Sequence, residues 1–249
     1  MKARKPPVPI HLHVQFYAPK CPERKRELDY VISKNLRNCI FNHFTVYTDH
    51  ISDASCLSSM DPATLNTILL DRRLTYSDWI SQTSFNHSIH GSHLSLLANS
   101  DIFFDYSLKD LLSWTDEKTF FAISRYENFK LILNPEVSQD SWGIYSSSLD
   151  NKSININNFK SSSSMSLGYL GCDNRIAAVA YESGYNIVNP CNSVYSHHLQ
   201  KSKERSYSES TRLLGSYLFS EPAQSDDLKQ SSRYIMAYFG KSGLLALPD

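Results

Sequence analysis

The spacing of apolar side chains divides the first fifty residues into a strand, a helix and a second strand. Residues 10–17 alternate polar positions with aliphatic or aromatic ones, which is the period of two typical of a β-strand. Two prolines follow, and residues 23–38 then repeat their apolar side chains at helical spacing. Residues 44–47 are a second short apolar run. A strand, a helix and a strand in this order predict a βαβ unit with a parallel sheet.

The same analysis predicts further elements along the rest of the chain. One apolar run is continuous, which is typical of a strand covered on both faces. Gly184 follows an amphipathic stretch and is placed to end a helix. The predicted helices cover residues 62–70, 76–85 and 174–183, and the predicted strands cover residues 94–98, 102–104, 120–124, 141–145 and 187–188. These elements predict an α/β domain with a mixed, mostly parallel central sheet flanked by helices.

Two stretches set the expected domain organisation. Residues 146–166 are rich in Ser and Asn, which predicts a mobile surface loop. Residues 203–249 contain one helical pattern, near residues 230–239, and are otherwise irregular. We therefore expect one domain over residues 1–207, with a helical or irregular C-terminal extension, residues 208–249, packed on it.

Composition and charge indicate which kinds of binding partner this chain has. The 249 residues contain 25 Lys and Arg against 25 Asp and Glu, and a nucleic-acid-binding protein would show a basic excess. The five cysteines form no CxxC pair, which favours reduced thiols in a cytoplasmic protein over disulfides or structural zinc. We expect no transmembrane segment, because no window approaches about 18 apolar residues. A peripheral contact of the basic N-terminal residues with the inner face of a membrane stays open.

The first candidate site is Asn99-Ser100-Asp101, directly after the continuous apolar run. In open α/β sheets, ligands bind beyond the carboxyl ends of the strands. A carboxylate between two apolar runs is costly to bury without a partner. A divalent cation that bridges a diphosphate would be such a partner. The alternative is a turn or helix-capping aspartate, because Asn, Ser and Asp are common in turns.

The second candidate is Asp173, which follows Gly171-Cys172 and begins an amphipathic helix. A helix N-terminus favours the ionised carboxylate, and Asp173 would then act as a general base toward a sugar hydroxyl. The alternative is an aspartate that only caps its helix.

The third candidate is the pair His197-His198, followed by basic residues and Tyr207. Adjacent side chains on an extended segment point to opposite sides, so at most one of the two histidines would face a given metal ion. The basic residues that follow, Arg205 among them, suit phosphate binding and equally suit a solvated face. Six other histidines, at positions 11, 13, 43, 87, 90 and 93, show no ligand spacing.

The order of these motifs resembles the GT-A glycosyltransferases, and among them the family-2-like inverting enzymes. The matching features are a buried strand ending in N-x-D, a G-x-D that opens a helix, then G-Y-x-I-x-N-P and Y-x-H-H, over roughly residues 8–207. The resemblance implies transfer of a sugar from a nucleoside-diphosphate sugar to a hydroxyl of a glycan or polysaccharide, with inversion and with Mn²⁺ or Mg²⁺ as cofactor.

The resemblance also implies a role for each matching residue. Asp101 and a late histidine, His197 or His198, would hold the metal ion, and Asp173 would be the catalytic base. Donor-binding residues would be Gln15, Phe16, Tyr17, Asp49, Arg73, Asn99, Ser100, Arg205 and Tyr207, and acceptor-binding residues would be Asp140, Trp142, Cys172 and Asn174. Two positions depart from the family pattern, because Asn99 stands where an Asp is usual and Cys172 where a Glu is usual.

Two rival interpretations remain at this point. A sugar nucleotidyltransferase would carry a glycine-rich loop after the first strand, and residues 15–20 contain no glycine. A non-catalytic nucleotide-sugar or carbohydrate-binding domain is favoured by the departures at Asn99 and Cys172. Donor hydrolysis in the presence of Mn²⁺ would distinguish an active transferase from an inert binding domain.

Overall fold

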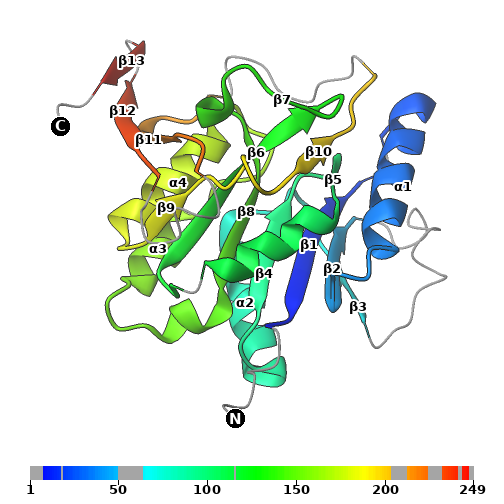
Figure 1. Cartoon of the computed structure of the whole chain (residues 1–249), viewed down its shortest axis with the longest axis horizontal. Coiled ribbons are helices and arrows are strands. Elements are labelled where there is room, and N and C mark those ends of the chain that lie inside the picture. Colours follow the sequence, from blue (N-terminus) through cyan, green and yellow to red (C-terminus); the bar gives the residue numbers. More distant parts are fainter. Residues whose placement is uncertain are drawn as a thin grey trace.

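A mixed β-sheet lies at the centre of the computed structural model, with helices against both of its faces (Figure 1). The structure describes residues 8–17, 19–49, 64–114, 116–202, 212–223, 232–240 and 243–246. The strands of this sheet are β1 (Ile10–Phe16), β2 (His43–Thr48), β3 (Leu65–Leu69), β4 (Leu94–Ala98), β5 (Ile102–Phe104), β6 (Thr119–Glu127), β7 (Lys130–Leu131), β8 (Gln139–Tyr145), β9 (Asn186–Val188) and β10 (Ser196–His198). Their order is β3-β2-β1-β4-β8-β6-β10-β5, with β7 and β9 also paired to β6.

The first half of the sheet is the predicted βαβ unit. β1 pairs in parallel with both β2 and β4, and β2 pairs in parallel with β3. The even-numbered residues of β1, Ile10 to Phe16, point to one face, where α1 (Pro22–Leu36) covers them with Leu28 and Ile32. Beyond β4 the direction changes, because β8 runs antiparallel to both β4 and β6. The predicted mixed sheet flanked by helices is therefore confirmed.

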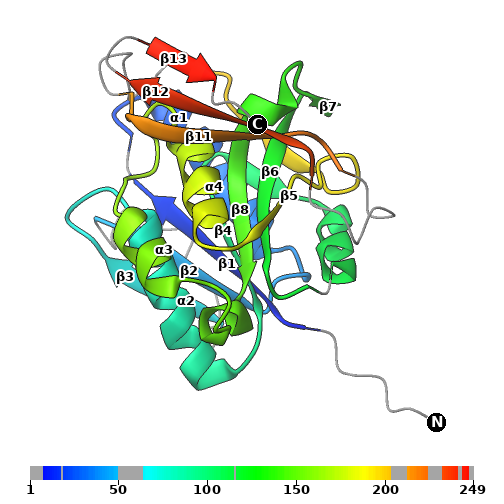
Figure 2. The same cartoon turned by 90° about the vertical axis from the view of Figure 1, so that its left-hand side faces the viewer.

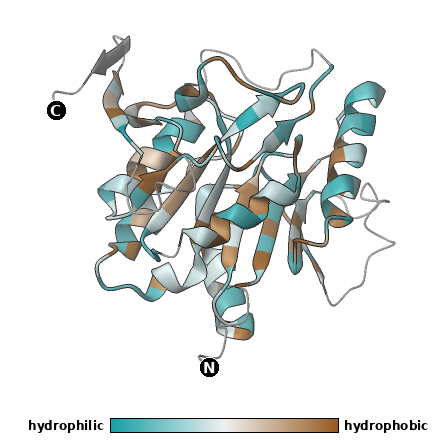
Figure 3. Ribbon diagram, viewed as in Figure 1, coloured by the Kyte–Doolittle hydropathy of each residue, from teal (hydrophilic) through white to brown (hydrophobic). Residues whose placement is uncertain are grey.

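The opposite face of the sheet is covered by three helices, α2 (Tyr76–His90), α3 (Ile156–Ser162) and α4 (Cys172–Glu182). Trp79, Phe159 and Ile176, one from each helix, are fully buried against the sheet. Figure 3 shows apolar positions concentrated in the strands and polar positions along the outer turns of α1. In the part of the chain that the structure describes, the remaining helical turns are 3₁₀ segments, η3 (Tyr106–Ser113), η4 (Pro135–Val137) and η5 (Ser146–Asp150). Within the described ranges, no helix is long and apolar enough to cross a membrane.

Two elements predicted within residues 1–207 are wrong. The helix expected over residues 62–70 is the strand β3, because its backbone pairs with β2 and long-range pairing outweighs local preference. The mobile loop expected over residues 146–166 contains α3, whose Phe159 is fully buried. Residues 163–167 are then fixed to residues 74–77 by backbone hydrogen bonds, including Leu167 N to Leu74 O at 2.9 Å.

The C-terminal extension is also built differently from the prediction. The helix expected near residues 230–239 is the strand β12 (Tyr234–Gly240), which pairs antiparallel with β11 (Gly215–Ser220) and β13 (Gly243–Ala246). Figure 2 shows this three-stranded sheet lying over α4. Leu218 of β11 is fully buried in the same apolar cluster as α4. The expected boundary between residues 207 and 208 lies outside the described residues.

Histidines gather where β1, β2 and β4 begin, at the end of the sheet opposite their carboxyl termini. The ring of His11 stacks on that of His93 with centroids 3.9 Å apart, and His43 stacks on His90 at 4.5 Å. Burial, together with the neighbouring imidazoles, lowers the pKa of His11 to about 2 and that of His93 to about 4. These side chains therefore pack as neutral rings, in a cluster that sequence spacing did not indicate.

Gly171, at the start of α4, supplies a test of how closely the C-terminal sheet packs. Its φ is +81°, and a Cβ there would lie 2.1 Å from the hydroxyl oxygen of Tyr217 in β11. We expect Gly171→Ala to lower the free energy of unfolding by about 2–4 kcal/mol, from backbone strain and overpacking together. Gly91→Ala is the matched control, because its φ is +77° with nothing within 4 Å. Equal losses in chemical denaturation would contradict the close packing of β11 on α4.

Candidate functional site

The carboxyl ends of β1, β2 and β4 open into one cavity of about 560 Å³. Parallel neighbouring strands end at the same edge of a sheet, so residues far apart in sequence meet there. The segment that follows β4, residues 99–101, forms one wall. The predicted site residues that line the cavity are Gln15, Tyr17, Asp49, Arg73, Asn99, Ser100 and Asp101.

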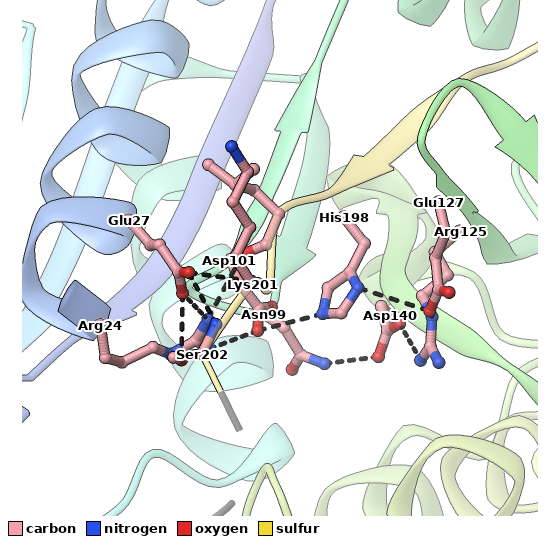
Figure 4. Close-up of polar contacts among 11 residues, drawn as sticks. Arg24, Glu27, Asn99, Asp101, Arg125, Glu127, Asp140, His198, Lys201 and Ser202 are labelled. Atoms are coloured by element: carbon pink, nitrogen blue, oxygen red, sulfur yellow. Dashed lines mark hydrogen bonds and ion pairs between the residues drawn. The ribbon is translucent and has the colours of Figure 1, made fainter. Parts of the chain in front are cut away.

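Asp101 is buried at the wall of this cavity between two basic side chains. Its Oδ2 accepts a hydrogen bond from Arg24 Nη2 at 2.5 Å and lies 3.2 Å from His198 Nε2 (Figure 4). Arg24 comes from the first turns of α1 and His198 from β10, so three distant parts of the chain meet at one carboxylate. The side chains of all three residues are at most 13% exposed.

Arg24 is held in place by a second carboxylate. Its Nη1 donates to Glu27 Oε2 at 3.0 Å and to the carbonyl oxygen of Leu199 at 3.3 Å. Glu27 Oε1 in turn accepts from the backbone N–H groups of Lys201 and Ser202 at 2.8 and 2.9 Å. The segment that leaves β10 is thus fastened to α1 by Glu27, and this contact fixes the guanidinium beside Asp101.

Burial and charge act against each other at this cluster. Burial disfavours the charged form of Asp101, but the hydrogen bonds and charges of His198 and Arg24 outweigh it and lower the pKa of Asp101 to about 2. Burial would lower the pKa of His198, and the bond to Asp101 reverses that effect, so the pKa of His198 is raised. Asp101 is therefore ionised at neutral pH, and its two partners stabilise that charge.

A second polar chain connects the cavity to the antiparallel half of the sheet. Asn99 Nδ2 donates to Asp140 Oδ1 at 2.7 Å, and Asp140 Oδ2 accepts from Arg125 Nη1 at 2.7 Å (Figure 4). Arg125 also bonds Glu127 at 2.9 Å, and Glu127 lies 3.6 Å from His198 Nδ1. Asp140, expected as an acceptor contact, is therefore tied to the residue that follows β4.

Asp173 is the second residue of α4 and lies within the electrostatic reach of Asp140 and Arg125. Burial raises the pKa of Asp173 to about 7, and the charge of Asp140 adds to the rise. The backbone N–H groups of Asp173 and Asn174 oppose it. A carboxylate with a pKa near neutrality can take up a proton at physiological pH, which is the property a general base requires.

Two arginines that follow β3 have partners of their own. Arg72 forms a bidentate pair with Asp78 at 2.7 and 2.9 Å, at the first turn of α2. Arg73 Nη1 lies 3.3 Å from the carbonyl oxygen of Gly168 and 3.4 Å from that of Leu167. Arg73 therefore crosses the cavity wall and positions the segment that precedes α4.

His197 points away from Asp101, on the other face of β10. Its Nε2 lies 2.9 Å from Asp105 Oδ2, and its ring stacks on Phe103 with centroids 4.9 Å apart. The alternation of side chains along a strand separates the two histidines, and the structure places only His198 beside Asp101.

Four predicted binding residues are buried away from the cavity. Phe16 belongs to the apolar cluster under α1, and Trp142 packs edge-to-face against Tyr76 on the opposite face. Cys172 Sγ accepts a hydrogen bond from the Tyr76 hydroxyl at 3.6 Å, and burial raises its pKa to about 12. The amide of Asn174 is also buried, against the carbonyl oxygen of Val137. A short motif does not indicate which face of its element a side chain takes, and the binding roles of these four residues stay predictions. Arg205 and Tyr207 lie outside the described residues.

The residues at Asp101 do not fit a divalent cation. Its Oδ2 carries a guanidinium and an imidazole, which are hydrogen-bond donors to the carboxylate. Asn99 directs its amide nitrogen to Asp140, which leaves at most its amide oxygen as a ligand. No group of three or more His, Cys, Asp or Glu side chains suited to a metal occurs in the described part of the chain.

Arg24, Glu27 and Arg125 belong to the site and were not among the predicted residues. One signal in the sequence points to the first two. Arg24 and Glu27 fall on the same helical stripe as Leu28 and Val31, so they are charged residues on the buried face of α1. Charged side chains on a buried stripe need a partner, and that partner, Asp101, lies 77 residues away.

Comparisons with known proteins bear on the fold. No protein-family model matches the chain, and no curated protein sequence matches it significantly. The structure of S. aureus TarS 1–349 in complex with UDP-GlcNAc aligns with a TM-score of 0.51 at 11% identity, over 80% of this chain and 60% of that chain. The mannosyltransferase PcManGT of Pyrobaculum calidifontis, solved with GDP-Man and Mn²⁺, aligns at 0.47 and 12% identity, over 80% of this chain and 62% of that one. This chain therefore spans less than two thirds of either, and the likeness to TarS shows that it has the predicted GT-A fold.

The buried cluster should be sensitive to the loss of its carboxylate. We expect Asp101→Leu to lower the free energy of unfolding by about 3–5 kcal/mol, because it leaves Arg24 buried without its main counter-charge. The double variant Arg24→Met, Asp101→Leu should lose less than the sum of the single losses. Arg72→Met is the control, since Arg72 is half exposed in its pair with Asp78 and should cost at most about 1 kcal/mol. Additive losses in urea denaturation would contradict the coupling.

The protonation of His198 should depend on Asp101. In the wild type, NMR titration should give His198 a pKa above the ordinary value of about 6.5. In Asp101→Asn the pKa should fall, because burial then acts without the opposing charge. Since the folded-state pKa of His198 is raised, its contribution to stability is complete below about pH 6.5 and declines as the pH rises through the folded value. An unchanged pKa in the variant would contradict the pairing.

Proposed function

We propose that this chain is a glycosyltransferase that moves a sugar from a nucleoside-diphosphate sugar to a hydroxyl group of a glycan or polysaccharide acceptor, with inversion. One observation carries the proposal: in a GT-A fold, Asn99-Ser100-Asp101 lie at the cavity where the parallel strands end, His198 contacts Asp101, and Asp140 contacts Asn99 and acts electrostatically on Asp173. TarS, which shares this fold, was solved with UDP-GlcNAc.

The donor would lie in the cavity at the ends of β1, β2 and β4. Gln15 is fixed there by Leu74 N at 2.9 Å, and Tyr17 and Asp49 line the wall beside it. Lys20, which is exposed at the rim, and Arg24 provide positive charge for the diphosphate. A volume of about 560 Å³ is in the range of sites that bind small ligands.

The acceptor would approach from the side of α4. Its hydroxyl oxygen attacks the anomeric carbon of the sugar as the bond from that carbon to the diphosphate breaks on the opposite face. Asp173 takes the hydroxyl proton, and the electron pair of the broken bond leaves with the nucleoside diphosphate. The charge that develops on the departing diphosphate is stabilised by the fixed positive groups of the cavity. The extension over residues 208–249 would support α4 through β11.

Replacing the base should separate binding from turnover. Asp173→Asn should keep the affinity for the nucleotide and lose about 10²- to 10⁴-fold in turnover, the usual contribution of a general base. Donor turnover and nucleotide-induced thermal shift are the two measurements. Asp150→Asn, an exposed carboxylate beside His87 and distant from the cavity, is the control. Wild-type turnover in Asp173→Asn would remove the base assignment.

The pH dependence of kcat/KM should reflect the protonation of Asp173. A base must be deprotonated to act, so kcat/KM should rise with pH and level off above the pKa of Asp173, about 7. In Asp173→Asn the remaining activity should lack this rise. A wild-type profile that is flat between about pH 5 and 9 would contradict the role of Asp173.

A further inference from the structure

A guanidinium occupies the position at Asp101 where the sequence resemblance expected a divalent cation. Arg24 Nη2 lies 2.5 Å from Asp101 Oδ2, and the same side chain lines the cavity. Building on the proposed function, we infer that the cavity binds a nucleoside diphosphate without a divalent cation, and that Arg24 supplies the positive charge.

The first argument is that contacts within the fold hold the Arg24 side chain in a fixed position. It is 7% exposed and bonds Asp101, Glu27 and the carbonyl oxygen of Leu199. Each carboxylate has further partners, His198 for Asp101 and two backbone N–H groups for Glu27. A metal ion at Asp101 would have to share the carboxylate with this fixed cation and would meet its repulsion.

The second argument is the set of available ligand atoms. An ion held by an N-x-D pair would use the carboxylate of Asp101, and Oδ2 of that carboxylate already accepts from Arg24 Nη2 at 2.5 Å. His198 Nε2 faces Asp101 Oδ2 at 3.2 Å, which is a hydrogen-bond geometry within the carboxylate pair. Asp101 and His198, the two side chains that would hold the ion, are therefore engaged with each other.

The third argument is that an arginine side chain can take the place of a metal ion beside a diphosphate. A guanidinium is planar, stays charged at any physiological pH and matches the oxygens of a phosphate group. Burial disfavours its charge, but the carboxylates of Asp101 and Glu27 outweigh this and raise the pKa of Arg24 further. The guanidinium at the cavity wall therefore stays protonated, and Lys20 at the rim adds an exposed positive charge.

Metal dependence of nucleotide binding is the decisive measurement. UDP, GDP, ADP, CDP and TDP would be titrated into the full chain by calorimetry, once with excess EDTA and once with excess MnCl₂. We expect at least one nucleotide to bind with the same Kd in both conditions. Arg24→Met should weaken that binding about 10- to 100-fold, as expected for loss of a charge-assisted hydrogen bond. Arg24→Lys should retain part of it, and Arg37→Met, on the exposed end of α1, should bind like the wild type.

Electron paramagnetic resonance of Mn²⁺ gives a readout that needs no variant. With the nucleotide present, adding the wild-type chain should not reduce the signal of free Mn²⁺ below that of nucleotide and Mn²⁺ alone. Binding that occurs only with Mn²⁺, together with loss of the free signal, would overturn the inference and leave the proposed function standing. Binding in EDTA that Arg24→Met does not weaken would overturn the role of Arg24. If no nucleotide binds in either condition, the proposed function itself fails, and the inference falls with it.

Discussion

A carboxylate placed between two buried strands must be neutralised, and the arrangement of the site follows from how this chain meets that requirement. Asp101 follows β4 and precedes β5, in surroundings where an unpartnered charge is strongly unfavourable. Arg24 and His198 supply the partners, and Glu27 then fixes Arg24 and the backbone after β10. One ionised group thus joins α1, the edge of the parallel sheet and a strand from the second half of the chain.

The change from parallel to antiparallel pairing between β4 and β8 positions the rest of the site. Because β8 begins where β4 ends, Asp140 lies beside Asn99, and Arg125 of the neighbouring β6 reaches the same carboxylate. The charge of Asp140 also acts on Asp173 at the start of α4. A polar network therefore extends from the cavity at β1 and β4 to β6, and its charge acts on the start of α4.

The apolar periodicity of the sequence predicted the elements in which buried side chains recur at regular spacing. It failed where pairing with a distant part of the chain determines the secondary structure. β1, α1, α2, β4 and α4 follow from apolar spacing and from glycine and proline signals. β3 and β12 do not, because a short apolar run fits a helix or a strand until its pairing partner is known. Asp101 and His198 were predicted side chains, but Arg24 was not, since its partner is 77 residues away. The sequence also does not give the orientation of each element about its axis, so it did not indicate that Trp142 and Cys172 are buried away from the cavity.

The stacked imidazoles at the opposite end of the sheet have a consequence for how the protein tolerates acid. His11 and His93 hold pKa values of about 2 and 4 in the folded chain, whereas an unfolded chain returns them to about 6.5. The unfolded chain therefore takes up more protons as the medium becomes acidic, and the equilibrium moves toward it from about pH 6.5 downward. Mild acidification would therefore lower the stability of the fold through these two rings, while Asp101 at the other end of the sheet kept its charge.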